Sequence, residues 1–96
     1  MRAYEVMYIL QPTLSAEEQT ALVDRFNDLI ASMGGTVENT DRWERQALAY
    51  EIKRFREGYY VVVTFQGDPV LETEMDRQMK LTEPLLRHMI LRRDEK

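Results

Sequence analysis

The sequence contains no cysteine. Disulfide bonds, thiolate metal sites and thiol catalysis are therefore excluded, and packing must hold the fold together. Only three prolines and four glycines occur in 96 residues, so the chain has too little flexible material to be disordered. No apolar run approaches the roughly 18 residues that span a bilayer, and the N-terminal residues lack the apolar stretch of a signal peptide. We expect a cytoplasmic protein with no membrane partner.

Residue patterns that carry catalysis or bind metals are also scarce. The sole histidine, His88, lies in an apolar segment, where a lone histidine is more often packed than a ligand. The carboxylates fall at spacings typical of solvated helix faces, such as Glu72 with Asp76. Neither GxGxxG nor GxxxxGK[ST], the glycine-rich phosphate loops, occurs. We therefore expect no enzyme activity, no small-molecule substrate, no metal and no cofactor.

The chain does contain enough apolar material for one core, since 44% of its residues are hydrophobic. We expect a single domain over residues 1–96. Residues 3–10 alternate as in a strand, with two apolar series on opposite faces. Ser15 and Glu18 have the spacing of a capping box, which predicts a helix over 16–33. The Gly34-Gly35 pair supplies the left-handed residue that ends this helix.

The second half predicts a hairpin, a helix and a final strand. Residues 36–53 have an extended pattern, and residues 53–58 are predicted to form the tip that joins them to a strand over 59–65. Asp68 before Pro69 is a strong helix start, and residues 85–92 suit a strand. The resulting order βαββαβ predicts a ferredoxin-like α+β fold, with a four-stranded antiparallel sheet and two helices on one face.

Charge is divided unevenly among these elements, although the net charge is only −4. Residues 15–35 carry four acidic residues and one basic residue, and residues 68–83 carry five acidic and two basic, so both helices are acidic. We expect the sheet side to hold the bases, in two clusters that bind phosphates. The alternative is that these charges are merely solvated at strand ends. The predicted clusters are Arg2 with Arg92 and Arg93, and Lys53 with Arg54 and Arg56.

The first and third strands are apolar on both faces. One face must lie under the helices, and the other would be polar if it met only water. We expect a partner to cover this second face. The alternative, which has equal weight, is shielding by long side chains such as Arg45 or Arg87. The residues expected on the partner face are Met7, Ile9, Val61, Val63 and Phe65.

Several segments together resemble a known family. They are the run RAYEVMYILQP over residues 2–12, the Gly34-Gly35 pair, Trp43, LAYEIK over 48–53, GYY over 58–60 and RHM over 87–89. The Leu-Ala-Tyr-x-Ile segment followed by Gly-Tyr-Tyr is specific in combination. In these segments the chain resembles the bacterial small-subunit (30S) ribosomal protein S6 family, over nearly its whole length.

The resemblance implies a structural protein of the cytoplasmic ribosome, with a ferredoxin-like fold and no catalytic activity. It implies binding to the central domain of 16S rRNA together with ribosomal protein S18. The RNA-binding candidates are Arg2, Arg45, Lys53, Arg54, Arg56, Arg87, Arg92 and Arg93.

Two other functions remain open at this point. Residues 56–61 loosely match the third-strand motif of RNA-recognition motifs, which would make the chain a stand-alone single-stranded RNA-binding module. The chain could instead be an α+β interaction domain that forms a homodimer through the open sheet face. Tight binding to short unstructured RNA without a protein partner would favour the first alternative, and a stable homodimer in sedimentation the second.

Overall fold

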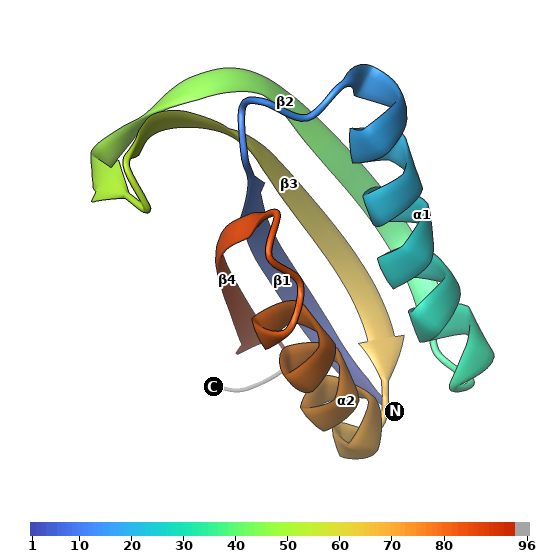
Figure 1. Ribbon diagram of the computed structural model, residues 1–96. Coiled ribbons are helices and arrows are strands. Elements are labelled where there is room, and N and C mark those ends of the chain that lie inside the picture. The colour runs from blue at the N-terminus through green and yellow to red at the C-terminus, as the bar shows by residue number, and fades with distance from the viewer. Residues whose placement is uncertain (94–96) are drawn as a thin grey trace.

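The computed structural model describes residues 1–93. These residues form β1 (Arg2–Leu10), α1 (Ala16–Ser32), β2 (Thr36–Ile52), β3 (Phe55–Gly67), α2 (Pro69–Lys80) and β4 (Leu85–Arg92). The strands make one antiparallel sheet in the order β2-β3-β1-β4. Both helices lie on the same side of the sheet (Figure 1), and we call the opposite side the open face. The predicted ferredoxin-like α+β fold is confirmed.

Local sequence signals set both ends of α1. The Glu18 amide donates to Ser15 Oγ at 3.1 Å, and the Ser15 amide donates to Glu18 Oε1 at 2.8 Å, so the predicted capping box is confirmed. The helix ends at Ser32, one residue before the predicted end. Gly34 follows with a φ of 83°, a conformation that glycine adopts without the steric cost of a side chain.

The β2–β3 turn is tighter than predicted. Ile52 pairs with Phe55, so only Lys53 and Arg54 form the turn, and residues 55–58 belong to β3 rather than to a loop. Lys53 and Arg54 have φ values of 50° and 72°. Two consecutive positive φ values are what a type I′ turn requires, usually with Asn-Gly. Because neither residue type appears here, the sequence carried no signal for so short a turn.

The second helix begins where Asp68 and Pro69 predicted it. Asp68 is the N-cap residue, but its side chain makes no capping hydrogen bond, so it acts only as a negative charge beside the helix N-terminus. The helix ends at Lys80, and the Thr82 hydroxyl donates to the Gln78 carbonyl at 2.7 Å in the following turn. The predicted bounds of the last strand, 85–92, are confirmed.

The core lies between the helices and the sheet. In the β1–β3 register Tyr4 pairs with Phe65 and Tyr8 with Val61, and cross-strand partners in a sheet share a face. Val61, Val63 and Phe65 are at most 1% exposed and belong to this core. Their predicted place on the open face is therefore wrong. The other face of the run 61–65 carries Val62 and the weakly polar Thr64, so the alternation was too weak to fix which residues point inward.

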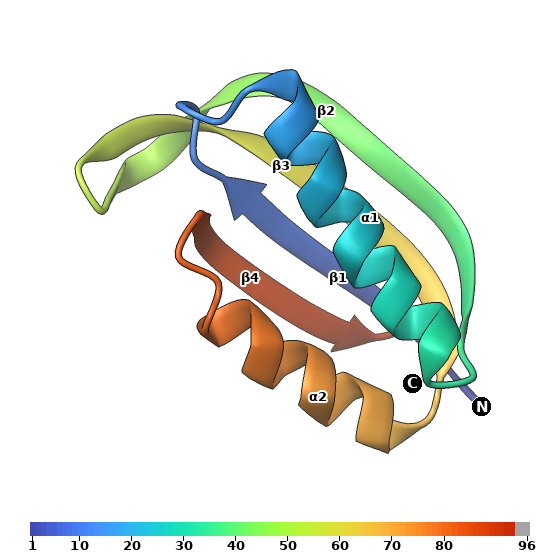
Figure 2. The same cartoon turned by 45° about the vertical axis from the view of Figure 1, so that its right-hand side comes forward.

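The far end of the β2–β3 hairpin extends past the end of β1 (Figure 2). We call residues 46–58 the hairpin arm, because β3 pairs with β1 only from Tyr59 onward. A Cβ atom on Gly58 would lie 2.5 Å from Ile9 Cγ2, so glycine allows the arm to pass closely over β1. The Lys53 ammonium donates to the Leu85 carbonyl at 3.4 Å. The arm thus bends back to the beginning of β4.

Candidate RNA and protein interface

The middle of the open face is apolar. The strand registers pair Met7 with Val62 of β3 and Met89 of β4. These three residues alternate along their strands with the core residues, so they point to the open face. Met7 and Ile9 are the two predicted partner-face residues that do lie on this side. Ile9 is only 4% exposed, because the arm covers it.

Two residues of β4 add to this apolar surface and were missed in the sequence. Met89 is 38% exposed and Leu91 49% exposed. They alternate with His88 and Ile90, and this period-two pattern was the signal that would have placed them outside the core. The open face therefore reaches across β1 to the edge strand β4.

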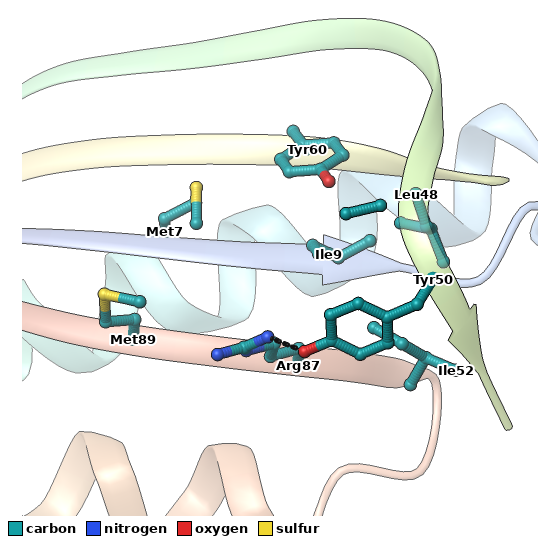
Figure 3. A pocket seen from close by; sticks show the side chains of 9 residues that line it. Met7, Ile9, Leu48, Tyr50, Ile52, Tyr60, Arg87 and Met89 are labelled. Atoms are coloured by element: carbon teal, nitrogen blue, oxygen red, sulfur yellow. Dashed lines mark hydrogen bonds between the residues drawn. The ribbon is translucent and has the colours of Figure 1, made fainter. Parts of the chain in front are cut away.

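The arm and the open face enclose a pocket of about 180 Å³. Figure 3 shows Leu48 and Ile52 of the arm at one end of the pocket, with Ile9 beside them and Met7 farther along β1. The pocket is also lined by Ala49 and Tyr50 of the arm and by Tyr60, Arg87 and Met89 of the sheet. We call this hollow the arm pocket.

The candidate basic residues follow the edge strand β4. Lys53 reaches the carbonyl of Leu85 at the beginning of β4, Arg87 lies within the strand, and Arg92 ends it. The Arg93 amide donates to the Ala3 carbonyl at 2.8 Å, which brings it to the β1 strand that Arg2 begins. We define the basic edge as Arg2, Lys53, Arg54, Arg87, Arg92 and Arg93.

The basic edge does not lie entirely on the open face, which corrects the expected arrangement. Tyr4 pairs with Arg92 and is two residues from Arg2, so all three point to the helix side. Burial and the nearby Glu72 raise the pKa of the Tyr4 hydroxyl, and the charges of Arg2 and Arg92 oppose this rise, so both guanidinium groups lie near it. The sequence did not predict which side of the sheet Arg2 and Arg92 would point to, because the alternating pattern at these strand ends is too short.

Arg93 is on the open face, where its Nη1 atom lies 3.7 Å from Glu5 Oε1. This contact is solvent-exposed and so contributes little to stability. The expected proximity of Arg2, Arg92 and Arg93 is confirmed, with two of the three on the helix side of the sheet and one on the open face.

Arg45 and Arg56 stand apart from the basic edge. The Arg45 guanidinium lies over the Tyr59 ring, 5.6 Å from its centroid, and donates to the Tyr59 hydroxyl at 3.4 Å. This hydrogen bond raises the pKa of Arg45. Arg56 Nε lies 3.6 Å from Glu51 Oε1 within the arm. Arg56 thus lies on the arm in an exposed contact that contributes little, and Arg45 serves to hold β2 against β3.

One acidic residue of α2 contacts the edge strand β4 itself, through a side chain that points to the helix side. His88 Nε2 of β4 lies 2.7 Å from Asp76 Oδ1 of α2, and Lys80 Nζ lies 2.9 Å from the other oxygen of Asp76. These two contacts lower the pKa of Asp76, with His88 the larger cause. The sole histidine is therefore a packing residue between α2 and β4.

Residues 1–93 contain no group of three or more histidine, aspartate or glutamate residues placed to hold a metal ion. In the same part of the chain no helix has the length and apolar character to cross a membrane. The fold and its surfaces define an α+β protein of the ferredoxin-like class that presents an apolar sheet face and a basic strand edge. The chain belongs to the ribosomal protein S6 family, whose model, described as "Ribosomal protein S6", matches residues 3–92.

Individual relatives are similar to this chain over nearly its whole length. The small ribosomal subunit protein bS6 of Desulforudis audaxviator is 47% identical over 94 residues, which cover 98% of this chain and 100% of the relative. That of Moorella thermoacetica is 42% identical over 95 residues, 99% of this chain and 97% of the relative. The crystal structure of 30S ribosomal protein S6 from Thermotoga maritima has a TM-score of 0.91 at 33% identity, and the match covers 96% of this chain and 87% of that one. The chain is a structural protein of the small subunit of the cytoplasmic ribosome, and it is not an enzyme.

Proposed function

We propose that this ribosomal protein binds the central domain of 16S rRNA along its basic edge, with ribosomal protein S18 on its open face. The observation that carries the proposal is the alignment of the basic edge with one strand. From Leu85 to Arg92 the strand covers roughly 23 Å, at about 3.3 Å per residue. Basic groups at both ends of this span, Lys53 and Arg54 at one end and Arg92 and Arg93 at the other, suit a stretch of RNA backbone rather than a single phosphate.

Binding of this kind is mainly electrostatic. Arginine and lysine neutralise phosphates and release the counterions condensed on RNA, and such contacts position a protein without reading base sequence. Both helices are acidic and lie on the side of the sheet opposite the open face, where RNA would be repelled. The charge pattern therefore favours one orientation, with β4 toward the RNA.

The open face supports the second half of the proposal. Met89, Leu91, Trp43 and Tyr50 are between 38% and 60% exposed on the sheet and the hairpin beside it. Exposed apolar surface of this kind marks sites of protein association. A second ribosomal protein that covers this face would remove it from water while leaving Arg2 and Arg92, which point to the helix side, free for RNA.

The test is the affinity for a 16S rRNA fragment that contains the central domain, measured with and without S18. We expect the two proteins together to bind the fragment more tightly than either does alone. Equal affinity of the mixture and of the separate proteins would contradict the proposal.

The two alternatives have less support from the residues described. Tyr59 lies on the helix side against the core, and Tyr60 stacks on Trp43 with ring centroids 5.5 Å apart. The sheet therefore offers no row of free aromatic rings in the described region, as a single-stranded RNA-recognition surface would require. Tight binding to short unstructured RNA without S18, or a stable homodimer in sedimentation, would reverse this judgement.

A further inference from the structure

The arm pocket has the dimensions of one side chain. Leu48 and Ile52 of the arm and Met7 and Met89 of the sheet give it aliphatic and thioether walls. Its volume of about 180 Å³ compares with the roughly 150 Å³ at which an apolar cavity accepts a benzene ring. Methionine side chains adapt their shape to what they contact. A pocket of this kind suits a single ring or a branched aliphatic group.

One charge lies beside these apolar walls. Arg87 Nη1 donates to the Tyr50 hydroxyl (Figure 3), which is a neutral acceptor. Three arginines of the described chain, Arg56, Arg77 and Arg93, have carboxylate partners instead. Within residues 1–93 Arg87 makes no salt bridge, although it is the charged residue that lines the pocket. Its charge is thus available to a carboxylate that arrives from outside.

We propose that the arm pocket receives one ring-sized apolar side chain of the partner protein, next to a carboxylate that pairs with Arg87. This inference rests on the proposed function, which supplies S18 as the partner. It changes the role of Arg87, which the resemblance assigned to RNA, to protein recognition. An apolar anchor in a pocket beside an arginine is the usual composition of the residues that dominate a protein interface.

The walls favour a protein side chain over a nucleobase. A base needs a free ring face to stack on and polar groups along its edges. Trp43 covers one face of the Tyr60 ring, and the Tyr50 hydroxyl already accepts from Arg87, so few polar groups of the lining remain for the edges of a base. Most of the other lining side chains are aliphatic or thioether, which matches a hydrophobic side chain.

The methionines provide reporters for the test. Met7 and Met89 line the arm pocket, whereas Met75 and Met79 are buried between α2 and the sheet. The full-length protein would be labelled with ¹³C on the methionine methyl groups, and S18 would be added while methyl spectra are recorded. We expect the Met7 and Met89 resonances to shift together, and those of Met75 and Met79 to stay in place.

Two variants and a control separate the pocket from the rest of the surface. Ala49→Phe places a ring in the pocket from its exposed rim, and Arg87→Met removes the charge while keeping a long apolar side chain. Each should weaken S18 binding by about tenfold or more, as changes at central anchor positions do. Arg56→Met, on the arm but outside the pocket lining, should change it less than about twofold. Thermal unfolding of each variant verifies that it is folded.

The outcomes distinguish this inference from the proposed function. If S18 binds while Met7 and Met89 do not shift, the inference is wrong and the proposed function stands. If RNA without S18 shifts these two methyl groups, or if they shift with protein concentration alone, the occupant is a nucleic acid or a second copy and the inference is again wrong. If no complex with S18 forms under any condition, both are overturned.

Discussion

At the scale of the residue, the turn between β2 and β3 shows a conflict between stability and charge. Lys53 and Arg54 both have positive φ values, which cost residues with a Cβ atom roughly 1–2 kcal/mol each. Asn-Gly would fit the same turn with far less strain. The chain instead places two cations there, at one end of the basic edge, and this is what RNA binding at the edge would require.

Replacing the turn should therefore separate the two properties. We expect Lys53→Asn combined with Arg54→Gly to raise the free energy of unfolding by about 1 kcal/mol, because the strain is relieved. The same variant should bind rRNA more weakly, because two phosphate-binding charges are lost. Urea denaturation and a titration with the central-domain fragment measure the two effects.

The control for the turn is Arg54→Gln, which keeps the left-handed strain and removes one charge. It should weaken RNA binding without stabilising the fold. If the turn variant is more stable and binds RNA with the affinity of the parent, Lys53 and Arg54 do not contact RNA.

At the scale of the element, α2 is fastened to the edge strand β4 by a side-chain contact. Asp76 accepts from Lys80 on its own helix and lies 2.7 Å from His88 on the strand, and these contacts lower its pKa. A carboxyl group whose pKa is lowered by folding stabilises the protein above its unfolded pKa, about 3.9, and this contribution is lost as the pH falls through the folded pKa.

Asp76→Asn tests this contribution. We expect the variant to be less stable than the parent at pH 6 by roughly 0.5–1 kcal/mol, a small value because the side chain is 42% exposed. The difference should shrink as the pH is lowered from 4 toward 2. Urea unfolding at a series of pH values measures it, with Glu83→Gln in the exposed α2–β4 turn as control. A difference that is constant over the whole pH range would contradict the assignment.

The elements also show which features a sequence can predict. The beginning of α1 followed from the Ser15 and Glu18 capping box, because its hydrogen bonds join residues three positions apart. The predicted face for Val61, Val63 and Phe65 was wrong, because Val62 makes the run apolar on both faces and Thr64 is only weakly polar. The β1–β3 register decides which residues of β3 point into the core.

At the scale of the whole molecule, three surfaces are separated: acidic helices, an apolar open face and a basic strand edge. Counting charge in each predicted element indicated that the basic residues would cluster. The count did not indicate to which side of the sheet their side chains point. The arm pocket had no signal in the sequence. It depends on contacts such as that between Tyr50 and Arg87, which are 37 positions apart and meet only because the hairpin arm bends over β1.

The central claim is that the basic edge, and not basic charge in general, holds the RNA. Its most direct test is the salt dependence of binding to the central-domain fragment with S18 present. One variant combines Arg2→Ala, Arg92→Ala and Arg93→Ala. The charge-matched control combines Arg25→Gln, Arg77→Gln and Lys80→Gln on the helices. Thermal unfolding of the edge variant should change little, because these residues lie at the exposed ends of β1 and β4.

The slope of log affinity against log salt reports the number of phosphates neutralised, at about 0.7–0.9 for each contact. The account predicts that the edge variant flattens this slope by nearly that amount for each arginine removed, and that the helix variant leaves it unchanged. Equal effects of the two variants, or an unchanged slope in the edge variant, would contradict it.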